Sequence, residues 1–404
     1  MKITKLERSL RRRTIVALAL SVCGLASVPA MAANDDLVWS ISSDQSGPAS
    51  YDGKFQAESF KDYVKWKNDN GGIRGRKIKL IVNDTTFDPA KAISGLKQVL
   101  SREKPVYIFG DGTAMTKIFS PENNTTHKIL MSSGSFASEF DDTEKFPFHF
   151  IAGTSYGDQQ LLLLRHIKAT HKGGKPKVGF IHSNTAWGRD GVEAAVAYAK
   201  ELGFDVELVQ QTKLVETDVG PYVLAVRRAK LDYVIFTGYQ FSVWPEIVRL
   251  SRDYGLTTQF MGQHWAMDRT AIQKIGKVAD GYMGISPYVF STTNAKHEML
   301  KTIDAIQRAK DPKYSGYPPM GYFHAWFSAM MATKAIEMTL DKGQELNGEN
   351  LANNLRSVKG WDTGIISVPV DFAGQKVPVG RVYRWDASKN WDPVPVSDWL
   401  TLKK

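Results

Sequence analysis

The chain has 404 residues, 43% of them hydrophobic, and a formal net charge of +10. That length is too great for a single hydrophobic core and favours two domains. The excess of Lys and Arg is mild and spread along the chain, so it predicts no basic stripe of the kind that binds nucleic acid.

The N-terminal residues have the pattern of an export signal. Six basic residues precede an apolar run at 15–25. Ala30-Met31-Ala32 then places small residues at the two positions that a signal peptidase recognises. We predict a signal peptide over 1–32, cleaved before Ala33, and a periplasmic protein. The apolar run is shorter than the ~20 residues that cross a bilayer. Arg12-Arg13 leaves general and twin-arginine export both open.

Cleavage at this point also changes the composition of the protein. The remaining 372 residues carry 46 basic and 41 acidic side chains, a net charge of +5. Cys23, the one cysteine, leaves with the signal. The mature chain then has no disulfide and depends on packing for its stability.

The first part of the mature chain alternates short buried strands with amphipathic helices. The spacing of its apolar residues predicts a helix at 53–70 and strands at 37–42, 77–83, 106–110 and 129–132. Another helix follows Asp88-Pro89, because Asp88 is a good N-cap and proline is tolerated at the first helical position.

The same alternation continues in the second part. It predicts strands at 178–182, 206–210, 233–238, 259–262 and 282–286, short strands in 364–385, and helices at 190–202, 222–229, 244–254, 295–310, 322–341 and 347–357. Strands separated by single helices indicate an α/β fold with parallel sheets wound by right-handed crossovers. No flexible linker is present, so two lobes would be joined by several tight crossings.

An ordered set of short motifs resembles a known family. The motifs are Ser46-Gly47-Pro48-Ala49, Asn70-Gly71-Gly72-Ile73-Arg74-Gly75, Asp84 with Asp88-Pro89, Trp187-Gly188-Arg189, Gly238-Tyr239 and the segment 255–262. Together they resemble the leucine/isoleucine/valine-binding proteins, the extracytoplasmic receptors of branched-chain amino acid ABC transporters. The resemblance runs from about residue 37 to about residue 385.

The resemblance implies a type I periplasmic binding protein, in which two doubly wound parallel-sheet lobes share three hinge crossings. It places one lobe at 35–155 plus 287–360 and the other at 156–286 plus 361–404. The crossings would be 153–157, 286–287 and 367–370. A ligand would bind between the lobes, at the carboxyl ends of the strands.

The resemblance also implies where the first lobe holds a ligand carboxylate. The two loops concerned are 110–114 and 132–138, and their predicted ligand-binding residues are Thr113, Ala114, Ser135, Phe136 and Ala137. Small residues let the backbone approach an anion, and a helix N-terminus adds partial positive charge. Asp111 is an unfavourable neighbour for an anion, because like charges repel.

The resemblance further implies that three aromatic residues, at positions where the family has aromatics, close over the ligand. Tyr51 follows the first strand, Trp187 lies on a loop of the second lobe, and Tyr239 follows the strand that ends at Gly238. Such rings supply apolar area and one polar atom for a hydrogen bond. Most of the 44 aromatic residues must be core, but these three lie on loops at strand ends.

His264 departs from the family pattern. The family's amino-acid binders carry an acid here that pairs with the ligand ammonium, and a neutral histidine attracts that group only weakly. One hypothesis is a carboxylate or uncharged polar ligand with an apolar or aromatic body. The other is that Asp111 or Asp268 supplies the missing negative charge. An amino acid, an aromatic acid, an amide and urea all remain open as ligands.

The remaining motifs favour binding over catalysis. No phosphate-binding Gly-x-x-x-x-Gly-Lys-Ser/Thr loop is present, and the histidines lack metal-ligand spacing; His166 and His171 are expected to be solvated. We predict no Gly-x-Ser-x-Gly nucleophile elbow, enzyme activity, cofactor or metal. The expected function is a monomeric solute receptor that delivers a small molecule to an ABC permease. A sensor of the same fold is the alternative, and an exported α/β enzyme is a third class.

Overall fold

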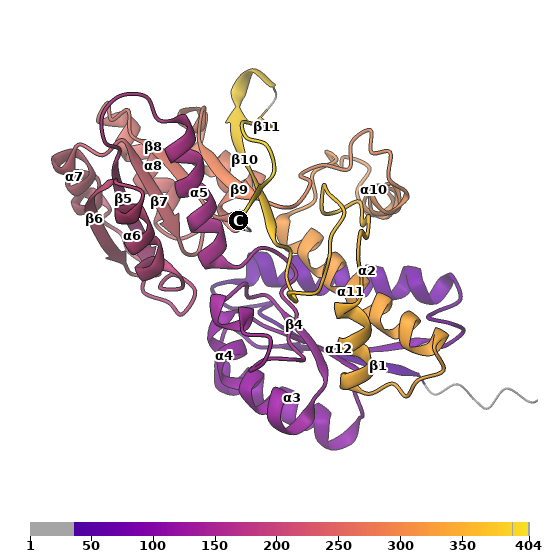
Figure 1. Ribbon diagram of the computed structural model, residues 1–404. Coiled ribbons are helices and arrows are strands. Elements are labelled where there is room, and N and C mark those ends of the chain that lie inside the picture. The colour runs from indigo at the N-terminus through magenta and orange to yellow at the C-terminus, as the bar shows by residue number, and fades with distance from the viewer. Residues whose placement is uncertain (1–35, 390, 403–404) are drawn as a thin grey trace, which may run out of the picture. The chain divides into compact units, whose positions relative to one another are not determined.

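The structure is a computed structural model that describes residues 36–389 and 391–402. The predicted signal peptide and its cleavage site lie outside these residues. Within them the strands form two sheets. One has four strands in the order β2-β1-β3-β4, and the other has eight, in the order β11-β10-β9-β8-β7-β5-β6 with β12 beside β10. We call the four-stranded sheet with its helices the first lobe, and the eight-stranded sheet with its helices the second lobe (Figure 1).

The first lobe is a parallel sheet with helices packed on it. Its strands are β1 Leu37–Ser43, β2 Ile78–Asp84, β3 Tyr107–Gly110 and β4 Leu130–Ser133. Its helices are α2 Ser50–Asp69, α3 Pro89–Arg102, α4 Thr113–Glu122, α10 Glu298–Lys310, α11 Met320–Asp341 and α12 Gly348–Arg356. The side chain of Asp88 accepts the N–H of Ala90 at 2.8 Å, which confirms the predicted N-cap of α3.

The second lobe combines a parallel core with an antiparallel edge. Its strands are β5 Lys177–Ser183, β6 Asp205–Thr212, β7 Tyr233–Thr237, β8 Gln259–Gly262, β9 Met283–Ser286, β10 Val379–Asp386, β11 Asp392–Pro395 and β12 Leu400–Thr401. Its helices are α5 Tyr156–Thr170, α6 Val192–Glu201, α7 Gly220–Ala229, α8 Trp244–Asp253 and α9 Arg269–Ile275. Strands β5 to β9 are parallel, whereas β10 runs antiparallel to β9, β11 and β12. The link between β10 and β11 is too short for a crossover helix, so this pair is a hairpin.

Three local predictions differ from the structure. Strand β10 begins only at Val379, and residues 364–378 form isolated bridges rather than the predicted short strands. The segment Tyr156–Thr170 forms α5, a helix that the strand and helix predictions omit. This helix buries Leu162, Leu163 and Leu164, and also His166, which is 6% exposed instead of solvated. Burial lowers the pKa of His166.

The chain passes between the lobes three times within the described residues. It does so after the short helix η2 (Ser138–Asp141), between β9 and α10, and between α12 and β10. Lys376, on the third passage, lies 2.6 Å from both Asp141 and Asp158 and so ties the third passage to the first. Short, cross-linked connections of this kind restrict relative motion of two lobes to a hinge.

Candidate functional site

A cavity of about 430 Å³ lies where the carboxyl ends of the strands of the two lobes meet. The segments after β1, β2, β3 and β4 line it from the first lobe, and those after β5, β6, β7 and β8 from the second. The lining includes Ala49, Asp52, Gln56, Phe87, Asp111, Thr113, Ala114, Gly134, Tyr156, Asn184, Trp187, Arg189, Tyr239 and Trp265. Because this surface is mainly apolar with a few polar groups, it suits a small organic molecule.

The structure brings four of the predicted ligand-binding residues into this lining: Thr113, Ala114, Trp187 and Tyr239. The Trp187 ring stacks on Tyr156 at 5.6 Å, and its Nε1 donates to Gln263 Oε1 at 3.3 Å. These contacts hold the indole in place before any ligand arrives.

Tyr51 lies outside the lining and connects the two lobes. Its hydroxyl is 2.8 Å from Thr270 Oγ1 and 3.1 Å from Asp268 Oδ1, and its ring is 4.3 Å from that of Phe241. Burial raises the pKa of the Tyr51 hydroxyl, so the phenol is neutral.

Ser135 and Ala137 also lie outside the lining, and their polar groups are bonded to their neighbours. Ser135 Oγ donates to Thr113 Oγ1 at 2.9 Å and accepts the N–H of Ala137 at 3.1 Å. The Ser135 hydroxyl and the Ala137 N–H therefore satisfy one another in this conformation.

Phe136 and His264 belong to an aromatic core at the junction of the lobes. The Phe136 ring lies 5.6 Å from His264, 5.4 Å from Trp265 and 5.1 Å from His324. His264 is fully buried, its Nδ1 is 2.9 Å from Ser286 Oγ, and burial lowers its pKa to about 3. His264 is thus a neutral core residue that does not line the cavity.

Two carboxylates line the cavity. Asp111 is 7% exposed and accepts hydrogen bonds from the Thr85 hydroxyl and, at 2.7 Å, from the N–H of Gly112. Asp52 lies in the first turn of α2 and accepts a hydrogen bond from Gln240 Nε2 at 3.1 Å. Burial is the main cause that raises the pKa of both groups, and the pKa of Asp52 reaches about 8.

Asp52 is not among the predicted ligand-binding residues, although its position in the sequence gives one indication of such a role. Asp52 follows the Ser46-Gly47-Pro48-Ala49 motif at the start of a helix, beside the carboxyl end of the first strand. Acidic residues are common in the first turn of helices for structural reasons, so the position alone does not mark a ligand contact.

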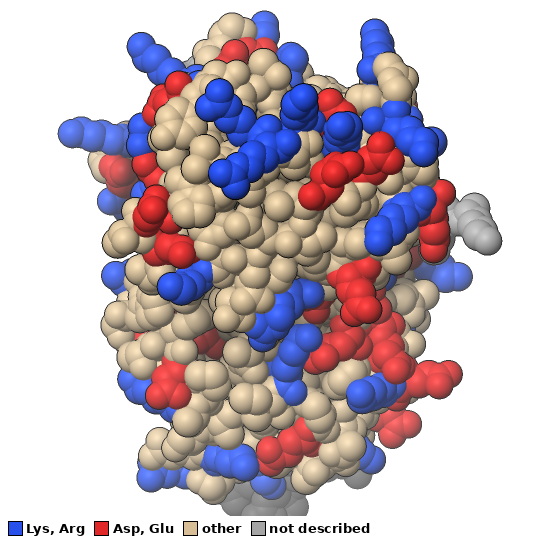
Figure 2. All heavy atoms as spheres, turned by 90° about the vertical axis from the view of Figure 1, so that its left-hand side faces the viewer, with Lys and Arg blue, Asp and Glu red and all other residues tan. Residues whose placement is uncertain are grey.

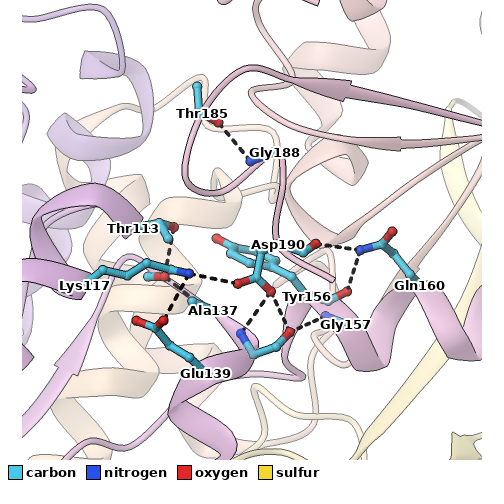
Figure 3. Close-up of polar contacts among 12 residues, drawn as sticks. Thr113, Lys117, Ala137, Glu139, Tyr156, Gly157, Gln160, Thr185, Gly188 and Asp190 are labelled. Atoms are coloured by element: carbon cyan, nitrogen blue, oxygen red, sulfur yellow. Dashed lines mark hydrogen bonds and ion pairs between the residues drawn. The ribbon is translucent and has the colours of Figure 1, made fainter. Parts of the chain in front are cut away.

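A polar cluster joins the lobes at one side of the cavity (Figure 3). Asp190, on the loop between β5 and α6, accepts hydrogen bonds from the N–H and hydroxyl of Ser138 at 3.0 and 2.6 Å. Lys117 on α4 lies 3.5 Å from Asp190 and 3.3 Å from Glu139. The cluster therefore links the second lobe to the segments that follow β3 and β4.

Residues 153–157 match the Gly-x-Ser-x-Gly spacing of a hydrolase nucleophile elbow, so the prediction that the chain has no such motif is wrong. The surroundings of Ser155 do not resemble such an elbow, since the residue follows a passage between lobes instead of a strand. Its hydroxyl donates to Asp141 Oδ2 at 2.9 Å, and no hydrogen bond among the described residues joins it to a histidine. The match does not build a nucleophile and base pair.

The residues that the structure describes contain neither a metal-ligand cluster nor a membrane-spanning helix. There, no three His, Cys, Asp or Glu side chains are grouped to hold a metal ion. No helix in that part of the chain combines the length and apolarity needed to span a bilayer.

One face of the protein carries basic and acidic side chains side by side (Figure 2).

Comparison with known proteins identifies the family. The family model described as periplasmic binding protein matches residues 41–389. The chain is 22% identical to a Leu/Ile/Val-binding protein of Citrobacter freundii, over 85% of this chain and 91% of the relative. It is 24% identical to an amino acid binding protein of Pseudomonas aeruginosa, over 78% of this chain and 81% of the relative.

Solved structures share the fold. A branched chain amino acid ABC transporter protein from Thermus thermophilus with bound valine matches with a TM-score of 0.81 and 21% identity, over 91% of this chain and 96% of that one. A solute binding protein of an ABC transporter from Rhodopseudomonas palustris, in complex with 3,4-dihydroxy benzoic acid, matches with a TM-score of 0.74 and 16% identity, over 92% and 98%. The chain belongs to the periplasmic binding protein family, has its type I fold, and is related to the Leu/Ile/Val-binding proteins, as its motifs predicted.

Proposed function

We propose that the protein is the extracytoplasmic receptor of an ABC importer. It binds one small molecule between its lobes, closes on it by a hinge motion and delivers it to a permease in the cytoplasmic membrane. The observation that carries this proposal is the cavity, because both lobes line it at the carboxyl ends of their strands.

The proposed mechanism is a shift between open and closed states. A ligand that touches Asp111 on one side and Trp187 on the other stabilises the closed state by its differential affinity for the two states, and by no more than that. The proposed lobes are 35–155 plus 287–360 and 156–286 plus 361–404, with crossings at 153–157, 286–287 and 367–370. The binding cycle involves no covalent chemistry.

The proposed location and assembly follow from the same role. Removal of residues 1–32 on export leaves a periplasmic protein. It works as a monomer, because both lobes must reach the permease.

The cavity favours a ligand with an apolar or aromatic body. Trp187 and Tyr239 face the cavity from the second lobe, and Phe87 lines it from the first. Flat, apolar side chains of this kind bury the body of a ligand, while a few polar groups orient its head. The relatives that hold valine and 3,4-dihydroxy benzoic acid show the range of ligands that this fold accommodates.

A thermal-shift screen of the purified mature chain tests the proposal. The compounds are amino acids, aromatic acids, amides, amines and urea. A true ligand present at 100 times its Kd should add about 2.7 kcal/mol to the free energy of unfolding. A Trp187→Ala, Tyr239→Ala double variant is the control and should lose the shift. Turnover of the bound compound, detected by mass spectrometry, would contradict a receptor without catalysis.

A further inference from the structure

We infer that the ligand is a cationic nitrogen compound, an amine, amidine or guanidine without a neighbouring carboxylate, whose charged head binds at Asp52 and Asp111. Its apolar body would lie against Trp187 and Tyr239. This inference rests on the proposed function, since it names the class of ligand for the same cavity.

The charges in the cavity lining favour a cation. Asp52 and Asp111 both contribute carboxylates, whereas the one basic side chain in the described lining, Arg189, is exposed and donates to Asn184 Oδ1. Two further carboxylates, those of Asp44 and Asp268, lie close enough to act on the pair through their charge. Burial and this repulsion raise the pKa values of Asp52 and Asp111, and a bound cation would stabilise the ionised carboxylates, whereas an anion would disfavour them further.

Asp52 also lacks the main-chain hydrogen bonds that stabilise the carboxylate of Asp44. Asp44 accepts the N–H groups of Ser46, Gly47 and Ala49 at 3.2, 2.6 and 2.8 Å. Asp52 receives a side-chain hydrogen bond only from Gln240 within the described residues.

Gln240, which contacts Asp52 but does not itself line the cavity, adds an independent acceptor. The side chain is fully buried, and its Oε1 has no hydrogen-bond partner in residues 36–389 and 391–402. A buried acceptor without a partner is costly, and an N–H donor of a ligand would satisfy it. An ammonium or amidinium group brings several donors and no acceptor.

Several polar groups of the 110–114 and 132–138 loops are already bonded within the protein. Ser135 and Ala137 are bonded to each other, and Ser135 donates to Thr113. The Asp111 carboxylate accepts the N–H of Gly112, the N-cap of α4, and so places a negative charge at the N-terminus of that helix. A ligand carboxylate would have to displace Asp111 or bind beside it.

Several other titratable groups surround the two carboxylates. Burial raises the pKa values of Tyr51 and Tyr239, and lowers those of His264 and His324 to about 3, so all four remain neutral between pH 6 and 9. Lys274, whose ammonium lies 4.7 Å from the Phe241 ring, and Arg189 are the basic groups nearby. Asp44 and Asp268 are the further acids in the set. A cationic ligand should therefore bind more tightly as pH rises through the pKa of Asp52, and release protons on binding.

Three matched sets of compounds test the inference by isothermal titration calorimetry on the mature chain. Each set keeps one body and varies the head: 2-phenylethylamine, phenylalanine and 3-phenylpropionate; 3-methylbutylamine, leucine and 4-methylpentanoate; and agmatine, arginine and 5-guanidinopentanoate. We expect the amine or guanidine without a carboxylate to bind best in at least one set, at least tenfold more tightly than its amino acid. Its affinity should rise between pH 6 and pH 9.

Two variants assign that binding to the carboxylates. Asp52→Asn and Asp111→Asn should each weaken binding of the cation at least tenfold at pH 8, with cooperative thermal unfolding retained. Asp69→Asn, which removes an exposed carboxylate of α2, should bind as the unmodified protein does. If Asp111→Asn fails to fold, Asp52→Asn and the pH dependence decide the question.

Three outcomes would overturn the inference: no binding by any of the three cations, tighter binding of an amino acid or acid in every set, or unchanged affinity in Asp52→Asn. The first leaves the proposed receptor function to the wider ligand screen. The second supports a receptor while rejecting a cationic ligand, so the two proposals fail separately.

Discussion

Asp190 of the second lobe accepts two hydrogen bonds from Ser138, which follows the last strand of the first lobe, at 3.0 and 2.6 Å. Asp190 is 8% exposed, and its main-chain oxygen also accepts the side-chain amide of Gln160 at 2.9 Å. The Ser138 hydroxyl in turn accepts the N–H of Gly157 at 2.8 Å. The hydrogen bonds from Ser138 to the Asp190 carboxylate form only while the two lobes stay together, whereas the Asp190–Gln160 bond lies within the second lobe.

Removing the Asp190 carboxylate should favour the open state. In Asp190→Ala the closed protein leaves the N–H of Ser138 without its acceptor, and Lys117 keeps only Glu139 as an ion-pair partner, which costs about 1–3 kcal/mol. Ligand affinity should fall by roughly 5- to 150-fold, and small-angle X-ray scattering should show a larger radius of gyration without ligand. Asp253→Ala removes an exposed acid that pairs with Arg249 and should change neither quantity. An unchanged affinity in Asp190→Ala would show that the cluster does not control closure.

Truncation of Trp187 should weaken ligand binding with little effect on the fold. The indole is half-buried and lines the cavity, so its loss removes ligand contacts while the core of the second lobe stays intact. We expect Trp187→Ala to weaken binding by about 1.4–2.8 kcal/mol, which is 10- to 100-fold in Kd. Trp187→Phe should keep most of the affinity. Calorimetry with whichever ligand the screen identifies measures both, and equal affinities for all three proteins would place the ligand elsewhere.

Neutralising Asp52 should stabilise the ligand-free protein at high pH. Burial and then the charge of Asp268 raise the pKa of Asp52 from 3.8 to about 8. The folded state therefore holds a proton that the unfolded chain has lost between these pH values, and the stability that Asp52 contributes falls as pH rises from about 4 to about 8. The free energy of unfolding of Asp52→Asn, relative to the unmodified protein, should be higher at pH 8 than at pH 5. Urea denaturation at the two pH values checks this, and a constant difference would argue against the raised pKa.

Buried histidines should make the protein sensitive to acid. Burial lowers the pKa values of His149, His264 and His324 from 6.5 to about 3. Below pH 6.5 these histidines bind protons in the unfolded chain but stay neutral in the folded state. The stability present above pH 6.5 is therefore lost as pH falls toward 3. In His264→Asn the free energy of unfolding should fall less steeply with decreasing pH, by about 1.4 kcal/mol per pH unit. Chemical denaturation from pH 6.5 to pH 4 measures the slope, and an unaltered slope would contradict a neutral, buried His264.

A methyl group on Gly53 should displace the helix that carries Asp52. A Cβ at Gly53 would lie 1.8 Å from the main-chain oxygen of Asp44, so α2 must move away from the segment after β1. We expect Gly53→Ala to lower the free energy of unfolding by about 1–3 kcal/mol and to weaken ligand binding as well. Gly174→Ala is the matched control, because its Cβ would meet nothing within 4 Å. Equal melting temperatures for the two variants would show that α2 accommodates the group.

Local patterns along the chain determined much of the fold. Alternating apolar residues mark the strands, and helical spacing with Asp88-Pro89 marks the start of α3, because side-chain periodicity and capping act over a few residues. The ordered motifs also indicated the family and the loops that meet at the cavity, including those that carry Thr113, Trp187 and Tyr239. Which ligand these residues bind stays a prediction.

Only the tertiary structure decided which side chains face the cavity and which are used by the protein itself. Asp52 lines it, His264 is buried in the core, and Ser135 bonds to Thr113, 22 positions away in the sequence. Tyr51 meets Asp268 across 217 positions. The orientation of α2 and the approach of the two lobes create these relationships, and both depend on packing between distant segments that leaves no periodic trace in the sequence.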